Sequence, residues 1–507
     1  MAKALMIQGT GSGAGKSLIA AALCRIFSGE GLRVAPFKAQ NMALNSFITR
    51  EGGEIGRAQA LQAEAARVLP TVDMNPVLLK ASGEAGSQVI VHGRPVRHMK
   101  AQEYYAYREE AWKAVKKSYR KLNRQYDLIV MEGAGSPAEI NLMDVDIVNM
   151  SAAKMAKAGV LLVGDIDKGG VFASLYGTVK LLGRDSRHIK GMIINKFRGD
   201  IGILNPGLEM IAEKTGIPVI GVLPYAMDLG LPEEDGLGLK SDGAGKRENG
   251  QAEKLRIVVV RLKYISNFTD FDALAQEPDV ELLYSRNPSD IENADMLIVP
   301  GTKNTVQDLQ FLRENGIDLS IGRAFEKGRA VVGICGGYQM LGKRICDPHG
   351  VESDCREVEG LGLLNIETIF ESGKTTCQAE AELIDSEPLG IKGSEKEMRA
   401  LKGYEIHMGR STGEIGLFRL KRFLHGKGSD VLDGSRNGSC WGTYLHGIFD
   451  NNGFRRALLD GLRSRKGFPP LGAATDYAGL RDAALDRLAQ LVREHLDLAF
   501  IRRMIKE

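Results

Sequence analysis

Residues Gly9–Ser17 read GTGSGAGKS and lie between a short apolar run, Ala4–Ile7, and a segment of helical period, Ser17–Phe27. A glycine-rich loop between a strand and a helix exposes successive backbone N–H groups and points the positive end of the helix at an anion. Lys16 is placed to reach the β and γ phosphates of a nucleotide, and the Ser17 hydroxyl to ligate Mg²⁺. The sequence therefore predicts an ATP-binding loop made of Thr10, Gly11, Ser12, Gly13, Ala14, Gly15, Lys16 and Ser17.

The spacing of this loop departs from the common phosphate-binding loop. The pattern G-x4-G-K-S requires glycine at position 10, where this chain has Thr10, and its first glycine, Gly9, lies one residue earlier. This longer loop resembles that of the dethiobiotin-synthetase-like branch of P-loop proteins. The alternative is a glycine-rich turn without a ligand. The Lys-Ser ending, in a strand–loop–helix context, favours a nucleotide site.

Short apolar runs alternate with segments of helical period through the first half of the chain. This alternation predicts βαβ units, and hence an α/β fold with a parallel sheet covered on both faces. Ligands bind such sheets at the carboxyl ends of the strands, where Glu132 and Asn195 are expected. We therefore predict that Glu132 is a second Mg²⁺ ligand and that Asn195 contacts the nucleotide. The predicted strands are Ala4–Ile7, Leu128–Met131, Val160–Val163, Met192–Ile194 and Val219–Leu223.

Length and composition bound the class of protein. A chain of 507 residues predicts two or three domains, and 43% apolar with 26% charged residues is typical of a globular protein. The net charge of +3 gives no basic field that would favour nucleic acid as a partner. No apolar run approaches the ~20 residues of a membrane span, and the first residues lack the charged, apolar and cleavage regions of a signal peptide, so we expect neither. The six cysteines form no CxxC pair, so we expect neither a zinc site nor a disulfide framework. We expect the protein to work in a reducing cytoplasm.

A polar, glycine-rich stretch at 236–254 predicts a linker. It separates an expected ATP-dependent domain, 1–235, from a second α/β domain, 255–450, and a helical extension, 451–507, completes the chain. Within the extension, Asp482–Ile505 has an apolar stripe that predicts one amphipathic helix packed against a domain. The predicted strands of the second domain are Leu255–Val260, Met296–Val299, Val331–Ile334 and Trp441–Leu445.

The second domain contains a cysteine between a strand and a helix, in the segment VVGICGGYQML at 331–341. A tight Gly-flanked turn exposes the Cys335 thiol at a helix N-terminus, where the pKa of a thiol falls. The alternative is that Cys335 is a small, buried core residue, but the sequence pattern G-x-C-x-G-x-Q favours a nucleophile. A thiolate needs a base, and His446 is preferred to His407 because it ends a strand at the same sheet edge. Backbone donors for an oxyanion are expected at Gly336 and in the strand-end loop that contains Gly301.

The segment around Cys335 resembles the glutaminase elbow of class I glutamine amidotransferases. Its pairing with a dethiobiotin-synthetase-like ATP domain resembles the enzymes that amidate cobyrinate and cobyrate, and within them the cobyric acid synthases. By motif position the resemblance implies that Cys335 is the nucleophile, His446 its base, and Gln339 a residue that holds glutamine. Class I enzymes have Glu two residues after the His, where this chain has Ile448, so a Cys–His dyad is implied and what orients His446 stays open. The stretches that carry the resemblance are Pro36–Ser46, Gly52–Gln59, Met74–Leu79, Ser87–Ile90 and Glu132–Pro137.

The resemblance implies a glutamine-hydrolysing carbon–nitrogen ligase of cobalamin biosynthesis, with ATP and Mg²⁺ as cofactors and glutamine and a corrinoid as substrates. It would amidate carboxylates b, d, e and g of adenosylcobyrinic acid a,c-diamide through acyl phosphates, giving adenosylcobyric acid. The nearest alternative is a cobyrinic acid a,c-diamide synthase, which Phe37–Ser46 disfavours. An alternative of another class is a MinD/ParA-like ATPase that binds partners. Those proteins have an extra Lys near the start of the loop, where this chain has Thr10 and Gly11.

Overall fold

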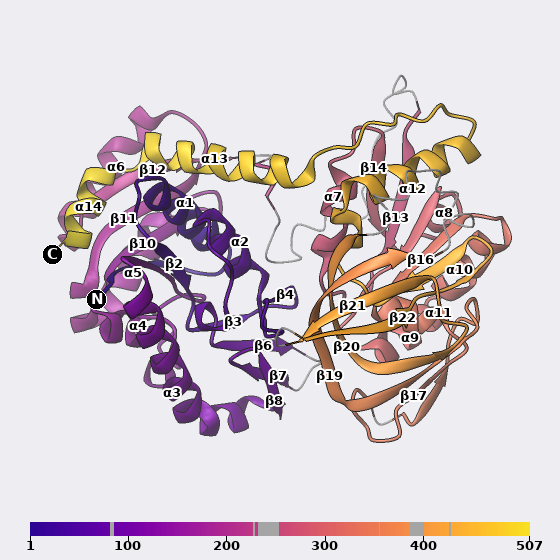
Figure 1. Ribbon diagram of the computed structural model, residues 1–507. Helices are drawn as coiled ribbons and strands as arrows, with labels where there is room; N and C mark the ends of the chain where they lie inside the picture. Colours follow the sequence, from indigo (N-terminus) through magenta and orange to yellow (C-terminus); the bar gives the residue numbers. More distant parts are fainter. Residues whose placement is uncertain are drawn as a thin grey trace.

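The chain forms two α/β lobes that lie side by side, as the computed structural model shows (Figure 1). The structure describes residues 1–81, 86–226, 229–231, 253–353, 355–384, 400–424 and 427–506. Most of the predicted linker, residues 236–252, lies outside the described residues. Within the described ranges, no helix combines the length and the apolar character that a membrane span requires.

The first lobe is built on a six-stranded parallel sheet in the order β12-β11-β10-β1-β9-β2. Helices α1 and α2 pack on one face and α3 to α6 on the other, because successive residues of β1 point to opposite faces and both faces are apolar. The predicted α/β fold of this half is confirmed. The strands are β1 (Lys3–Gly9), β2 (Val34–Phe37), β9 (Leu128–Glu132), β10 (Gly159–Asp165), β11 (Ile189–Phe197) and β12 (Val219–Pro224). The helices are α1 (Lys16–Gly29), α2 (Arg57–Ala65), α3 (Ala101–Gln125), α4 (Met150–Ala156), α5 (Val171–Leu181) and α6 (Ile201–Thr215), with short 3₁₀ turns at Val72–Met74, Met143–Val145 and Gly183–His188.

A smaller sheet and a hairpin extend the first lobe toward the second (Figure 1). The sheet has the order β3-β6-β7-β8, and β4 pairs with β5 as an antiparallel hairpin. The apolar pattern did not predict these elements, because their strands are short and carry polar residues that the two lobes bury together. They are β3 (Gln40–Met42), β4 (Ser46–Ile48), β5 (Glu54–Gly56), β6 (Val77–Ala81), β7 (Ser87–Val91) and β8 (Arg94–Met99).

The second lobe contains two sheets. One has the order β14-β13-β15-β16-β24-β23 and is parallel except for the edge strand β23, in agreement with the predicted α/β fold. Its strands are β13 (Leu255–Val260), β14 (Val280–Ser285), β15 (Met296–Val299), β16 (Ala330–Ile334), β23 (Ser435–Asn437) and β24 (Cys440–Thr443). The helical elements around it are η5 (Phe268–Phe271), α7 (Asp272–Ala275), α8 (Pro288–Glu292), α9 (Thr305–Glu314), α10 (Ile317–Glu326), α11 (Gly336–Leu341) and η7 (Ile448–Asp450).

The other sheet of this lobe is largely antiparallel and forms the wall of curved strands in the right-hand half of Figure 1. Its order is β18-β17-β19-β21-β22, with β20 paired to β19. Sequence analysis did not predict this sheet, because its strands alternate charged and apolar residues and face solvent on one side. The strands are β17 (Arg344–Cys346), β18 (Glu357–Glu359), β19 (Ile366–Leu383), β20 (Leu401–Gly413), β21 (Phe418–Leu424) and β22 (Lys427–Asp433).

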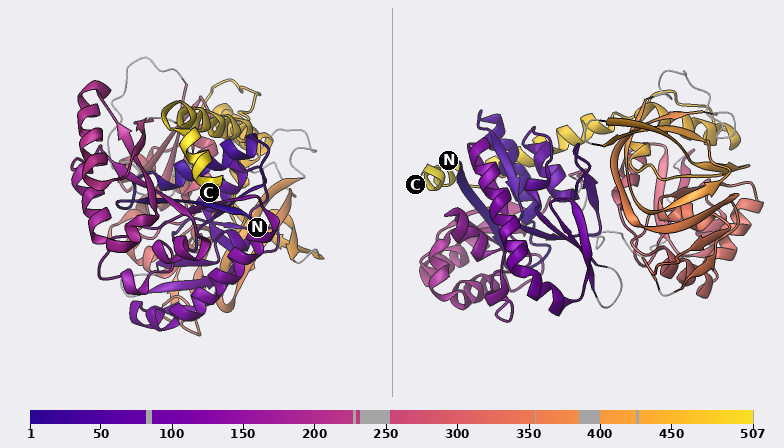
Figure 2. Two further views of the ribbon diagram at one scale, coloured as in Figure 1. Left: turned by 90° about the vertical axis from the view of Figure 1, so that its left-hand side faces the viewer. Right: turned by 60° about the horizontal axis from the view of Figure 1, so that its bottom comes forward.

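The C-terminal segment returns from the second lobe to the first. Helix α12 (Asn452–Arg465) packs in the core of the second lobe, while α13 (Tyr477–His495) and α14 (Leu498–Lys506) pack against the first-lobe sheet (Figures 1 and 2). The prediction of one helix over Asp482–Ile505 was wrong. The helix breaks at Leu496, which pairs with the edge strand β12, and Asp497 N then donates to Ile220 O at 2.8 Å.

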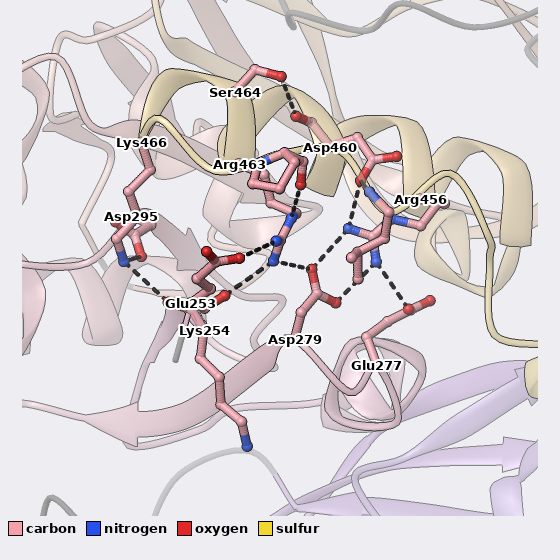
Figure 3. Close-up of polar contacts among 12 residues, drawn as sticks. Glu253, Lys254, Glu277, Asp279, Asp295, Arg456, Asp460, Arg463, Ser464 and Lys466 are labelled. Carbon is pink, nitrogen blue, oxygen red and sulfur yellow. Dashed lines mark hydrogen bonds and ion pairs between the residues drawn. The ribbon is translucent and has the colours of Figure 1, made fainter. Parts of the chain in front are cut away.

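Buried ion pairs fix α12 to the second lobe (Figure 3). Arg456 binds Asp279 through both terminal nitrogens at 2.9 Å, and Arg463 approaches the same carboxylate at 3.2 Å. Arg455, fully buried, donates to Glu277 at 2.7 Å. Removing one partner of such a network leaves an uncompensated buried charge, so these pairs position α12 firmly.

Candidate functional site

The Gly9–Ser17 segment is a phosphate-binding loop between β1 and α1. Gly13 and Gly15 have φ values of 72° and 95°, a left-handed conformation that favours glycine. Lys16 is buried, and its ammonium donates to Gly11 O at 2.8 Å and to Gly135 O at 3.2 Å. The loop therefore curls around the lysine at the N-terminus of α1, the geometry that receives phosphate.

Asn195 lies directly against this loop. Its amide nitrogen donates to Ala14 O at 2.9 Å, and a Cβ on Gly15 would meet that nitrogen at 2.1 Å. Asn195 therefore lies at the loop, and a side chain at position 15 would displace it; its contact with the nucleotide stays a prediction. The loop glycines and Asn195 form one packed unit.

Glu132 is the acidic centre of the nucleotide end. It closes β9, is almost fully buried, and its Oε1 accepts from Ser17 Oγ and from Lys38 Nζ, both at 2.8 Å. Oε2 accepts from the side-chain amides of Gln59 and Gln62, at 3.3 and 2.6 Å. The two predicted Mg²⁺ ligands thus adjoin one another. Mg²⁺ usually takes one or two protein oxygens and completes its shell with water and substrate phosphates, so this donor pair fits the ion. Across the described part of the chain, no cluster of three or more His, Cys, Asp or Glu side chains suggests a separate metal site.

A cleft of about 1450 Å³ opens beside the loop. Lys16, Ser17 and Glu132 are among the residues that line it. Met42, Tyr105 and Leu142 also line it, with exposed apolar side chains. The cleft is larger than the roughly 300–1,000 Å³ typical of a site for one small molecule.

Cys335 occupies a strained turn between β16 and α11. Its φ of 53° and ψ of −110° are unusual for a residue with a side chain, and such strain concentrates at functional sites. The following glycines are required by packing: a Cβ on Gly336 would lie 2.8 Å from Thr302 Cγ2, and one on Gly337 would lie 1.9 Å from Val299 O. The predicted nucleophile elbow is therefore present as a structure, with the thiol at the start of α11.

His446 adjoins Cys335, and Gly301 lies beside both. A Cβ on Gly301 would be 3.2 Å from His446 Cε1 and 3.7 Å from Cys335 Cβ. The structure thus brings the three predicted residues together, although β24 ends at Thr443 rather than at Leu445. His407 is placed differently: its ring bonds to Glu405 Oε1 at 3.2 Å and to Gly409 O at 3.1 Å, and is stacked on Tyr444.

A buried carboxylate orients His446. Asp270, in η5, has its Oδ2 2.6 Å from His446 Nδ1, and its Oδ1 accepts from Gly447 N at 3.2 Å. Burial lowers the pKa of His446, but the charge of Asp270, followed by the charge of Cys335 and hydrogen bonds to both groups, outweighs it and raises the pKa to about 10. The imidazolium form is therefore favoured beside the thiol, an arrangement that activates cysteine nucleophiles. Sequence reasoning did not find Asp270, because it precedes the histidine in the chain and belongs to no motif.

Gln339 and two charged side chains line the pocket around Cys335. Gln339 is buried, and its amide donates to Met408 O at 2.9 Å, so its side chain is fixed in this pocket; that it holds glutamine stays a prediction. Lys303 and Glu352 line the same pocket. Burial lowers the pKa of Lys303 and raises that of Glu352, and each charge partly offsets the effect on the other. A zwitterionic amino acid would meet one group of each sign.

One two-stranded wall separates the pocket from the cleft. In the β6–β7 pair, Leu79 lies opposite Val89, and both face the cleft of the first lobe. The next pair, Lys80 and Gln88, faces the Cys335 pocket of the second lobe. Alternation along the strands therefore gives each site one face of the same wall.

Comparisons with known proteins match both halves of the chain. Residues 5–238 match the CobQ/CobB/MinD/ParA nucleotide binding domain, and residues 256–454 match the CobB/CobQ-like glutamine amidotransferase domain. A cobyric acid synthase of Syntrophobacter fumaroxidans is 49% identical over 99% of each chain. One of Thermodesulfovibrio yellowstonii is 48% identical over 98% of each chain. One of Desulfitobacterium hafniense is 49% identical over 99% of this chain and 97% of that protein.

These relatives match the nucleotide-binding lobe, the glutaminase lobe and the C-terminal segment α12–α14 over nearly their full lengths. With identity near one half over essentially the full length, the chain belongs to the cobyric acid synthase family.

Proposed function

We propose that this chain converts adenosylcobyrinic acid a,c-diamide to adenosylcobyric acid, using ATP to activate carboxylates b, d, e and g and glutamine to supply nitrogen. The observation that carries the proposal is the back-to-back placement of the two sites. The Leu79–Val89 side of the β6–β7 wall faces the nucleotide cleft, and the Lys80–Gln88 side faces the thiol pocket.

The nucleotide end would activate the carboxylate. Lys16 and the amides of the loop would hold the β and γ phosphates, and Asn195 would fix the loop from behind. Ser17 and Glu132 would hold Mg²⁺, which supplies positive charge against the transferring phosphoryl group. The substrate carboxylate would attack the γ-phosphorus and displace ADP. The acyl phosphate formed in this way loses phosphate when ammonia attacks its carbonyl carbon.

The thiol pocket would release the ammonia. The Cys335 thiolate would attack the γ-amide carbon of glutamine, with the resulting oxyanion near the backbone of Gly336 and Gly301. His446 would protonate the departing ammonia and then take a proton from the water that hydrolyses the thioester to glutamate. Asp270 would keep the histidine in the orientation that both proton transfers need.

The size of the cleft suits a corrinoid beside the nucleotide. A corrin is a broad macrocycle with apolar faces and a rim of carboxylates, and the cleft offers exposed apolar side chains at Met42, Tyr105 and Leu142. With a face against these side chains, the corrinoid would present a rim carboxylate to the phosphate-binding loop. Successive carboxylates could then be presented by turning the ring in the same cleft.

The role of Lys16 tests the synthetase half. Lys16→Ala should abolish amidation with either glutamine or high ammonium as the nitrogen source, while glutamine hydrolysis at Cys335 persists. Lys214→Ala, which removes an exposed lysine of α6, is the matched control and should behave like the unaltered protein. Amidation that survives Lys16→Ala would place ATP binding elsewhere.

A cobyrinic acid a,c-diamide synthase, which shares both domains and this chemistry, is the alternative. The two activities differ in substrate and in the number of amides added. Supplying cobyrinic acid and its a,c-diamide separately distinguishes them, because our proposal requires turnover of the diamide.

A further inference from the structure

The segment that carries Asp270 is held by the other lobe. η5 follows Asn267, a residue with φ of 52°, and Asp270 N donates to Asn267 O at 3.0 Å. The turn at Asn267 therefore determines the position of Asp270. Both side chains are almost fully buried, so the position of the turn is fixed by its neighbours.

Those neighbours are Asn45 and Ser46 of the first lobe. The Asn45 side-chain oxygen accepts from Phe268 N at 3.2 Å, and the Asn267 side-chain oxygen accepts from Ser46 N at 3.0 Å. The two asparagines thus form a reciprocal pair across the domain boundary, each binding the backbone beside the other. Asn45, like Asn267, is buried, so water does not replace these bonds in the folded protein.

The same segment reaches His446 by a second contact. Tyr404 is stacked on the His446 ring, with centroids 5.2 Å apart and planes 13° apart, and its hydroxyl donates to Ser46 O at 3.4 Å. Ile48 of the adjoining hairpin packs with Tyr404 and Ile406 in a small core shared by the two lobes. Both the carboxylate partner and the stacking partner of the catalytic imidazole therefore rest on residues 45–48.

We propose that Asn45 is a positioning residue of the glutaminase, supplied by the synthetase domain: through Phe268 and Asn267 it sets the geometry of the Asp270–His446 pair. This inference rests on the proposed function, because it assigns Asn45 a role in glutamine hydrolysis. It adds that the glutaminase triad, Cys335–His446–Asp270, reaches full activity only with the synthetase domain docked.

The segment is also tied to the nucleotide end. Asn45 O accepts from Arg57 N at 3.2 Å, where α2 begins. The same helix presents Gln59 and Gln62, whose amides bind Glu132. A single short unit therefore contacts the predicted Mg²⁺ ligand at one end and the segments that hold the glutaminase base at the other.

The test compares the full-length protein with Asn45→Ala and Asn45→Asp, measuring glutamine hydrolysis and ammonium-driven amidation separately. Asn45→Ala should lower kcat for hydrolysis about three- to tenfold, the loss expected for one buried hydrogen bond. Asn45→Asp keeps the acceptor for Phe268 N and should restore most of that rate. Amidation with high ammonium should stay unchanged, because it does not use His446.

Two further readouts separate positioning from general weakening of the interface. Thr376→Val removes another interdomain bond, from Thr376 Oγ1 to Gly52 O at 2.8 Å, far from Asp270 along the chain. It should leave hydrolysis unchanged. In a double-mutant cycle, Asn45→Ala should add little to Asp270→Asn, because the first variant acts through the second residue.

The third readout is the pH at which the rate of glutamine hydrolysis falls on the alkaline side of its pH profile. Asn45→Ala should shift this fall to lower pH, as Asp270→Asn also should. The charges that act on the His446 ring are those of Asp270 from η5 and Cys335 from the elbow. Asp450 from η7 and Arg57 from α2 also act on the Tyr404 hydroxyl, whose ring is stacked on the imidazole. Equal losses in Thr376→Val and Asn45→Ala, additive effects in the cycle, or an unshifted alkaline fall would overturn the proposal. Absence of any glutamine hydrolysis in the unaltered protein would instead overturn the proposed function.

Discussion

Nδ1 of His446 lies 2.6 Å from Oδ2 of Asp270, although the two residues are 176 positions apart in the chain. The position two residues after the histidine, where related glutaminases have Glu, is occupied by Ile448, which is buried. The carboxylate of this site therefore comes from the turn before α7 instead. The fold restores a Cys–His–carboxylate arrangement by a different route.

Asp270→Asn should lower glutamine hydrolysis about 10²-fold, because the imidazole loses the group that orients it. Asp272→Asn, two residues along the same segment, is the matched control and should keep most of the activity. The measurement is kcat for glutamate release, with ammonium-driven amidation as a check on the synthetase. If both aspartate variants lost activity equally, the orienting role of Asp270 would be wrong.

The His446–Asp270 pair should make the free energy of unfolding fall as pH rises. The folded pKa of His446, about 10, lies above its ordinary value of 6.5, so the pair stabilises the fold fully below pH 6.5 and its contribution is lost as pH rises through about 10. In Asp270→Asn this alkaline loss should be much smaller. Unfolding temperatures of both proteins, taken across that range, measure the difference.

Cys335→Ala should abolish glutamine-dependent amidation and leave ammonium-dependent amidation at the rate of the unaltered protein. The reason is that the thiol forms a bond to the glutamine carbon and has no part in phosphoryl transfer. Cys346→Ala, at a half-buried thiol in β17, serves as the control. Continued use of glutamine by the Cys335 variant would show that another group is the nucleophile.

Glu352→Gln should raise KM for glutamine about 10- to 100-fold, the loss expected for one charge-assisted hydrogen bond to the α-ammonium group. Glutaramate, which is glutamine without that group, provides the matched substrate. The unaltered protein should prefer glutamine over glutaramate, and the variant should lose the preference. An unchanged preference would mean that the head group of glutamine does not contact Glu352.

Gly337→Ala should destabilise the second lobe by about 1–3 kcal/mol, because its Cβ would overlap the carbonyl oxygen of Val299. Gly322→Ala is the control: its Cβ would meet nothing within 4 Å, and alanine favours the helix in which it lies. Urea unfolding followed by Trp441 fluorescence, in a Trp112→Phe background, reports on this lobe alone. Equal midpoints for the two variants would contradict the packing argument.

The sequence predicted the parts whose pattern is local. Gly13, Lys16 and Cys335 lie within continuous segments where a strand passes through a turn into a helix, so spacing along the chain was enough to identify them. The parallel strands were predictable for the same reason, since buried strands are continuous apolar runs.

The remaining site residues are defined by contacts between distant segments. Asp270 becomes a partner of His446 only after β13, β15 and β24 are assembled, and Asn45 meets Asn267 only after the lobes dock. The break at Leu496 had a similar cause, because an amphipathic pattern continues through it and the contact with β12 interrupts the helix. Such relationships are tertiary, and periodicity along the chain does not encode them.

The mass of the corrinoid formed from adenosylcobyrinic acid a,c-diamide with ATP, Mg²⁺ and amide-¹⁵N glutamine shows how many carboxylates the enzyme amidates. We predict conversion of four carboxylates to amides, each carrying ¹⁵N. Unchanged a,c-diamide, together with formation of that diamide from cobyrinic acid, would instead identify a cobyrinic acid a,c-diamide synthase.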